Sequence, residues 1–324
     1  MESSAGIAER SGAALRGGDR ALPGRETQRT AVAEDGLLAH VGDYFTLTKP
    51  RIISLLLWTT VMTMFVARPS GLALSTVLWT CLGGYLAAGG AGAINHYIDR
   101  DIDARMGRTR GRPIVSGRIE PAHALIFGIS LGVLATVQLA ITVNALAAAL
   151  SLAGLLGYTL MYTAWLKPRT PQNIVIGGTA GAIPPLVGWA AATGGLAFDA
   201  FYPFAIIFLW TPPHFWALAL LISDDYKRSG IPMLPVVRGD DFTRSRILAY
   251  SIVLVAFTVV PVITGLFGVI YLVAALVLGA GFIIGAARLL RDHSRRTALR
   301  LYLGSLGYLF VLFAAMAADR VLAV

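Results

Sequence analysis

The feature that most restricts the fold is a series of long segments without any Asp, Glu, Lys or Arg. These segments cover residues 52–67, 69–98, 121–166, 170–198, 200–223, 247–287 and 301–318. Because a helix that spans a bilayer needs about 20 apolar residues, the segments indicate membrane-spanning helices. Two of them are long enough for helical hairpins, with turns expected at 142–144 and 264–265. The sequence therefore predicts an all-α polytopic membrane protein with nine transmembrane helices.

The composition excludes an ordinary soluble protein, since 56% of the residues are hydrophobic and only 14% are charged. A water-facing surface needs more charge than that. The net charge of +9 would suggest nucleic-acid binding in a soluble domain, but here the charges separate apolar segments. The predicted partner is thus the lipid bilayer and not nucleic acid. The one cysteine, Cys81, lies in an apolar segment, which excludes a disulfide framework and a cysteine-based metal site.

Residues 1–43 differ from the rest, because they are rich in Ser, Gly, Ala and Arg and have no sustained apolar run. Such a segment cannot bury enough surface to offset its ordering entropy, so we predict a disordered cytoplasmic tail before a membrane domain at 44–324. The tail lacks the apolar region of a signal peptide and carries seven acids, unlike a mitochondrial transit peptide. We therefore predict a bacterial inner-membrane protein.

The basic residues predict the orientation, since short loops rich in Lys and Arg stay in the cytoplasm. Threading nine helices from a cytoplasmic N-terminus places 25 of the 27 basic residues on that side, leaving only Arg68 and Arg320 outside. The C-terminus is then expected outside. The outer loops are too short to hold a catalytic or binding site, so the functional site is expected to face the cytoplasm.

Acidic residues gather at two predicted helix ends on that face. At about 100° per residue, Asn95, Asp99 and Asp103 share one side of a helix, whereas Asp101 points elsewhere. Three oxygen ligands in a row suit Mg²⁺, which takes a few carboxylates together with water and a substrate phosphate. The arginines that follow can bind phosphate groups, so the segment predicts a magnesium diphosphate site. These arginines are Arg105, Arg108, Arg110 and Arg112.

The second cluster has the same order of acids followed by bases. Asp224 and Asp225 precede Lys227, and we interpret Asp225 and Lys227 as catalytic candidates. The alternative is a solvated helix end, stopped by Gly230 and Pro232. Pairing with neighbouring arginines is likewise the alternative for the carboxylates of both clusters.

Two further bases follow the fourth predicted helix, and they either anchor it to lipid head groups or reach the same diphosphate. They are Lys167 and Arg169. The complete set of catalytic candidates is Asn95, Asp99, Asp103, Lys167, Asp225 and Lys227, with the first three as metal ligands. The candidates for binding diphosphate are Arg105, Arg108, Arg112, Lys167, Arg169 and Lys227.

Several motifs of the sequence together resemble those of a known family. The segment 95–113 is similar to the first Asp-rich motif of the UbiA-type intramembrane prenyltransferases. The segments 48–51, 162–170, 210–215 and 225–235 resemble the heme-modifying branch, the protoheme IX farnesyltransferases or heme O synthases. The resemblance spans residues 45–320, and the combination is more specific than any one motif.

The resemblance implies nine helices bundled around a central cavity open to the cytoplasmic side, with Mg²⁺ as cofactor. It also implies transfer of farnesyl from farnesyl diphosphate to a vinyl group of heme b. Addition of water would give heme O for terminal oxidases, with diphosphate released. Heme A synthase or an oxidase-assembly factor is the implied protein partner.

One departure concerns the second cluster. Quinone-type members usually carry a second acid four residues before the position of Asp225, where this chain has Leu221. The number of Mg²⁺ ions and the roles of Asp224 and Asp225 therefore stay open. The alternatives are a prenyltransferase for a quinone-precursor or chlorophyll-type acceptor, and a transporter. The absent second acid, together with His214, weighs against the first alternative, and the lack of an acid or Lys buried within a helix weighs against the second.

Aromatic residues and one histidine are candidates for the heme and prenyl cavity, because a carbocation must be shielded from water and aromatic faces attract cations. His214 lies inside a helix after two prolines, and an ionisable residue at membrane depth is a functional candidate. It either contacts the porphyrin or packs between helices. The aromatic candidates, each of which could instead belong to the core, are Tyr158, Tyr162, Trp210 and Phe215.

Overall fold

The computed structural model describes residues 39–323, and all regular structure within them is helical. Most of the predicted tail lies outside the described residues. The structure differs from that prediction at the last five tail residues, since 39–48 form a helix. Tyr44 of this helix, the first residue of the predicted membrane domain, packs edge-on against Phe127 at 5.0 Å.

Nine helices among the described residues are long and apolar enough to cross a membrane, which confirms the predicted number. The predicted hairpin turns are also confirmed, between 142 and 145 and between 263 and 269. The spans are α2 (Pro50–Ala67), α3 (Leu74–Ile98), α5 (Pro121–Thr142), α6 (Ala145–Leu156) continued by η1 (Gly157–Leu166), α7 (Asn173–Thr193), η2 (Phe198–Ala200) with α8 (Phe201–Leu221), α11 (Asp240–Ile263), α12 (Val269–Arg291) and α13 (Arg295–Leu322).

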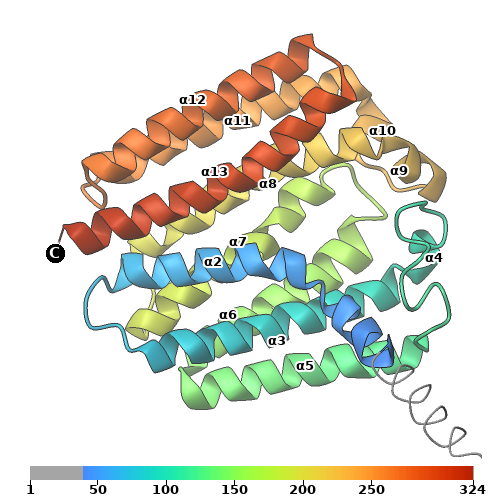
Figure 1. Cartoon of the computed structure of the whole chain (residues 1–324), viewed down its shortest axis with the longest axis horizontal. Coiled ribbons are helices and arrows are strands. Elements are labelled where there is room, and N and C mark those ends of the chain that lie inside the picture. The colour runs from blue at the N-terminus through green and yellow to red at the C-terminus, as the bar shows by residue number, and fades with distance from the viewer. Residues whose placement is uncertain (1–38, 324) are drawn as a thin grey trace, which may run out of the picture. The chain divides into compact units, whose positions relative to one another are not determined.

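Three short helices lie together at one end of the spans (Figure 1). They are α4 (Arg100–Asp103), α9 (Ser223–Ser229) and α10 (Leu234–Arg238). We call this end, with the connections 104–120, 167–172, 222–239 and 292–294, the charged end. The remaining connections between spans lie at the other end and are short.

Glycines allow several of the spans to approach closely. A Cβ atom on Gly90 of α3 would lie 2.6 Å from the carbonyl oxygen of Gly128 in α5. A Cβ atom on Gly188 of α7 would lie 2.3 Å from the carbonyl oxygen of Thr60 in α2. Small residues at such crossings are typical of membrane helices, where packing and not the hydrophobic effect drives association. This packing fixes the position of α3, whose end carries the acidic motif.

The fourth span changes from α-helix to π-helix at Gly157, a feature that the sequence pattern did not predict. The Thr163 hydroxyl donates to the carbonyl of Tyr158 at 2.8 Å, and the Lys167 amide donates to the carbonyl of Tyr162 at 2.9 Å. Both bonds bridge five residues instead of four. π-helical turns are uncommon and often occur at functional sites, because they redirect side chains.

Candidate active site

Asn95, Asp99 and Asp103 form a buried row at the charged end, which we call the carboxylate stripe. Their exposed fractions are 3%, 2% and 2%. The Asp99 amide donates to the Asn95 carbonyl at 2.9 Å, and the Asp103 amide to the Asp99 carbonyl at 2.8 Å. Helical spacing therefore continues across the junction of α3 and α4. The Asp101 side chain is 79% exposed, so the structure places the four residues as the spacing predicts.

Three cationic side chains from separate segments contact the stripe, and we call them the three cations. Lys49 precedes α2, Lys167 follows η1, and Arg112 belongs to the 104–120 connection. Charge-assisted hydrogen bonds of this kind are stronger than neutral ones. The pairs are Lys49 Nζ with Asn95 Oδ1 (2.5 Å), Lys167 Nζ with Asp99 Oδ2 (2.6 Å) and Arg112 with Asp103.

Lys49 adopts an unusual backbone conformation. Its φ of 58° and ψ of 55° lie in the left-handed region, and it is the one non-glycine residue with positive φ in 39–323. Such a conformation costs about 1–3 kcal/mol and persists only where the surroundings hold it. Burial and the nearby charge of Arg112 lower the pKa of Lys49 to about 7, although Asp99 opposes this shift. The strain and the burial together place this ammonium group at Asn95.

The π-helix supplies further contacts to the stripe. The side-chain amide of Asn95 donates from Nδ2 to Asp99 Oδ2 at 2.8 Å and to Oγ1 of Thr163, a π-helix residue, at 3.1 Å. In the same π-helix, the rings of Tyr158 and Tyr162 stack with their centroids 5.6 Å apart. The π-helical turn therefore brings a hydroxyl, two aromatic rings and Lys167 to one side of the stripe.

The stripe fits a divalent cation only together with an anion. Asp99 Oδ1 is buried and has no hydrogen-bond partner in the described part of the chain, so one carboxylate oxygen is free to bind a cation. No three His, Cys, Asp or Glu side chains within 39–323 converge on a metal position. The three cations and two carboxylates leave a net charge of +1 at full ionisation. This donor set suits Mg²⁺ that keeps water and takes a substrate phosphate, rather than an all-protein cage.

The second acidic cluster is organised differently. Asp225 accepts from the Gly107 amide at 3.3 Å and forms an ion pair with Arg228. Partial burial alone would raise its pKa, but these hydrogen bonds hold the pKa of Asp225 below its usual value. Asp224 and Lys227 are 82% and 57% exposed and pair loosely at 3.7 Å. Asp225 thus joins α9 to the 104–120 connection, whereas Lys227 is not brought to the stripe.

The other predicted diphosphate ligands divide into two groups. Arg105 and Arg108 are exposed on the 104–120 connection, next to Arg112 in sequence. Arg169 donates to the carbonyls of Ala164 and Trp165, both at 3.0 Å. It therefore binds the end of η1, and its role as a diphosphate ligand stays a prediction.

His214 lies in α8 between aromatic rings. It stacks on Trp210 at 4.2 Å and on Tyr302 of α13 at 4.8 Å. Its Nδ1 atom lies 2.7 Å from the Ser305 hydroxyl, which itself donates to the Tyr302 carbonyl at 2.6 Å. The ring of Phe215 lies edge-on to that of His214, with the two centroids 5.2 Å apart. Phe215 is 37% exposed, so it does not enclose His214 on that side.

Several residues of the site were missed by the sequence interpretation. Lys49 and Thr163 contact the stripe, and Ser305 contacts His214. The Lys-Pro dipeptide at the start of the first span could have indicated Lys49. Nothing in the local sequence indicates the contacts of Thr163 or Ser305, because each depends on the packing of distant helices.

Residues 56–315 match the UbiA prenyltransferase family. A protoheme IX farnesyltransferase from Roseiflexus sp. is 55% identical over 280 residues, or 86% of this chain and 52% of that protein. One from Gloeobacter violaceus is 51% identical over 286 residues, or 88% of this chain and 94% of that protein. The chain spans about half the length of several curated relatives, including those from Roseiflexus and Thermus thermophilus.

Two solved structures show the same fold. Digeranylgeranylglyceryl phosphate synthase aligns with a TM-score of 0.70 at 17% identity, over 87% of this chain and 99% of that one. A UbiA homologue from Archaeoglobus fulgidus bound to DMAPP and Mg²⁺ aligns with a TM-score of 0.60 at 15% identity, over 87% of this chain and 100% of that one. These likenesses confirm the predicted all-α membrane fold.

Proposed function

The chain belongs to the UbiA prenyltransferase family, and from that premise we propose that it transfers farnesyl from farnesyl diphosphate to a vinyl group of heme b. With addition of water, the products are heme O and diphosphate. The observation that carries the proposal is the identity of 51% to the Gloeobacter protein over nearly its full length. The buried stripe with its three cations supports the diphosphate half of this reaction.

Breaking the bond between an allylic carbon and diphosphate requires neutralisation of the leaving group's charge. Lys49, Lys167 and Arg112 surround the stripe and would stabilise that charge electrostatically, which is usually the largest catalytic contribution. Asp99 and Asp103 would hold Mg²⁺, with Asn95 as a third ligand. The bound Mg²⁺ would act as a Lewis acid on the diphosphate oxygens.

The prenyl chain would lie deeper than the diphosphate. Tyr158 and Tyr162 stack beside the stripe and would shield the allylic cation from water. We place the heme near His214, which lies seven residues, or about 10 Å, inside the charged end of α8. Imidazole is a common ligand of heme iron, so His214→Ala should lower heme b retention and leave farnesyl diphosphate binding nearly unchanged. Unchanged heme spectra and turnover would return His214 to a packing role.

The charged end is proposed to face the cytoplasm of a bacterial cell, with the C-terminus outside. The distribution of basic residues supports this orientation. A reporter fused after Val324 should report the outer face, and one inserted in 104–120 should report the cytoplasm. A cytoplasmic C-terminal reporter would contradict it. Heme O would then pass within the membrane to heme A synthase or an oxidase-assembly partner.

Mass spectrometry of hemes tests the proposed reaction most simply. Membranes that contain the chain should convert heme b to a product enlarged by one farnesyl group and one hydroxyl group, the hydroxyl coming from water whose proton is released. Membranes with the Asp99→Asn variant provide the control. Prenylation of a quinone precursor with no change in heme b would contradict the proposal.

A further inference from the structure

A groove of about 320 Å³ runs between α12 and α13, outside the site described above. Its floor contains Phe282 and Tyr308, whose rings stack at 5.0 Å, together with Leu301. Glycines at the rim leave it open, since a Cβ atom on Gly281 or Gly304 would meet nothing within 4 Å. None of the groove residues belongs to the carboxylate stripe or contacts His214.

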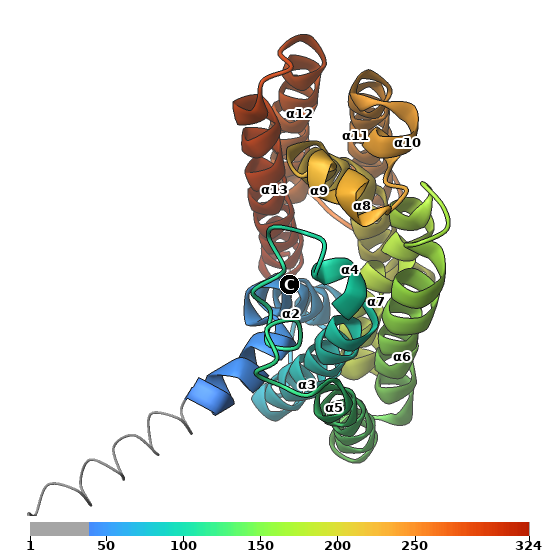
Figure 2. The same ribbon diagram turned by 90° about the vertical axis from the view of Figure 1, so that its right-hand side faces the viewer.

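The groove lies on two membrane spans that run side by side (Figures 1 and 2). Val277 at its rim is 67% exposed, and Leu303 of α13, next in sequence to the groove residue Gly304, is 54% exposed. Exposed apolar residues on both helices indicate contact with lipid. In a bilayer, an apolar groove on such a face is filled by a hydrocarbon chain, because its surface offers water few polar partners.

Two arginines lie at the charged end of the groove. Arg288 is three residues before the end of α12, and Arg300 is five residues after the start of α13. Neither side chain has a hydrogen bond or ion pair with the described residues, and no Asp or Glu lines the groove. At that depth their side chains reach the head-group region of the bilayer.

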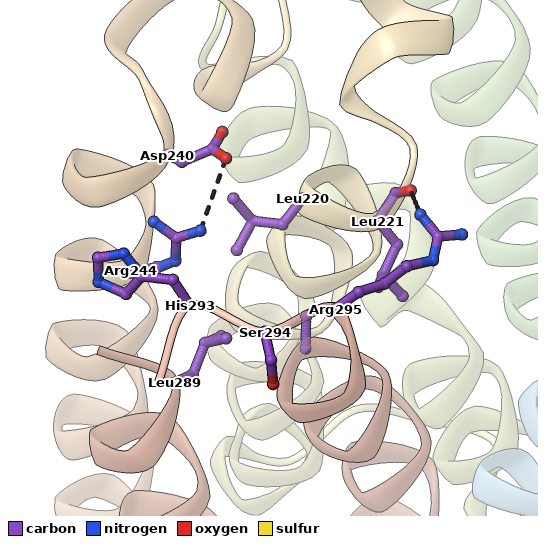
Figure 3. Close-up of a pocket in the computed structure, with 9 residues that line it drawn as sticks. Leu220, Leu221, Asp240, Arg244, Leu289, His293, Ser294 and Arg295 are labelled. Atoms are coloured by element: carbon purple, nitrogen blue, oxygen red, sulfur yellow. Dashed lines mark hydrogen bonds and ion pairs between the residues drawn. The ribbon is translucent and has the colours of Figure 1, made fainter. Parts of the chain in front are cut away.

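A nearby pocket among α8, α11, α12 and α13 contains arginines that pair with groups of the chain itself (Figure 3). There Arg244 pairs with Asp241 at 2.7 Å and with Asp240 at 3.6 Å. Arg295 donates to the Leu221 carbonyl at 2.6 Å. These arginines have protein partners, whereas the two at the groove are exposed and leave their guanidinium groups available to an anion from outside the chain.

We propose that the groove binds an anionic phospholipid, with one acyl chain along the Phe282 and Tyr308 floor and the phosphate between Arg288 and Arg300. A guanidinium group binds phosphate through two parallel hydrogen bonds, so two arginines can hold one head group from both sides. The shape, the lipid-facing position and the unpaired charges all point to the same occupant. The site is separate from the proposed farnesyl transfer and does not depend on it.

Native mass spectrometry of the full chain, taken from vesicles of phosphatidylglycerol and phosphatidylcholine, tests the proposal. The variant Arg288→Gln with Arg300→Gln should bind phosphatidylglycerol about 30-fold more weakly, or roughly fivefold for each arginine. The matched control is Arg291→Gln with Arg296→Gln, which removes the same charge from exposed positions outside the groove. The control should retain the lipid.

A second variant tests the groove without changing charge. Gly304→Leu places a side chain in open space and should displace the bound lipid while the helices stay intact. Equal loss in the arginine control would show a general surface-charge effect and overturn the proposal. Normal lipid retention by Gly304→Leu would overturn it too. Displacement of the lipid by farnesyl diphosphate would identify a substrate site instead.

Discussion

The two acidic clusters at the charged end share a sequence order of acids followed by bases, yet the structure uses them differently. In the carboxylate stripe, Asp99 and Asp103 are 2% exposed and are held by cations from distant segments. In α9, both ion pairs are local contacts three residues apart, and Asp224 is 82% exposed. Burial and long-range cation partners therefore distinguish a candidate reaction site from a surface helix.

The difference has an energetic consequence. An exposed ion pair contributes little, typically about 0–1 kcal/mol, because water and salt screen it. A buried carboxylate paired with a lysine is costly to disturb, since removal of one partner leaves an uncompensated charge. We therefore expect the effects of substitution to decrease from the stripe to Asp225 and then to the exposed acids.

The largest loss is expected for the stripe. Asp99→Asn or Asp103→Asn should lower heme O formation by about 10³-fold, because both the metal ligand and its charge are weakened. The rate is measured in membranes by mass spectrometry of heme products. Helical circular dichroism and the elution volume in detergent should match those of the unchanged protein. A loss below tenfold at both positions would contradict the role of the stripe.

Substitution of Lys167 compares the contribution of a buried cation at the stripe with that of an exposed cation in α9. Lys167→Met should lower the rate by about 10²-fold, since one buried donor to the leaving group is lost. Lys227→Met is the matched control, because it removes the same charge from an exposed position, and its rate should change less than about twofold. Equal losses in the two variants would remove the distinction between the clusters.

Asp225 is expected to have an intermediate effect. Asp225→Asn weakens the contact with the Gly107 amide and with it the position of the connection that carries Arg112. We expect about a tenfold rise in the KM for farnesyl diphosphate, with kcat changed less. A fall in kcat as large as that of Asp99→Asn would show that Asp225 belongs to the reaction site itself.

The smallest effect is expected for the exposed acids. Asp101→Asn and Asp224→Asn should each change the rate by less than about twofold, because their side chains are 79% and 82% exposed. Steady-state rates in membranes are sufficient to measure this. A loss at Asp101 equal to that at Asp103 would contradict the helical arrangement of the stripe.

Much of this arrangement could be predicted from periodicity and charge. Spacing by four residues predicts the common face of Asn95, Asp99 and Asp103, and the charge-free segments predict the spans and hairpin turns. The local sequence could not predict the π-helix, because that turn depends on packing against neighbouring helices. The partners of Arg169 could not be predicted for a similar reason, since they are carbonyl groups freed at the end of that π-helix.

Diphosphate release is expected to depend on the buried stripe and not on the α9 cluster. It can be measured as diphosphate released from farnesyl diphosphate in chelator-treated membranes supplied with heme b, before and after Mg²⁺ is restored. We predict that Mg²⁺ restores release in the unchanged protein and in Asp224→Asn, but not in Asp99→Asn. Release by Asp99→Asn at the unchanged rate, or release that needs no divalent cation, would contradict the account.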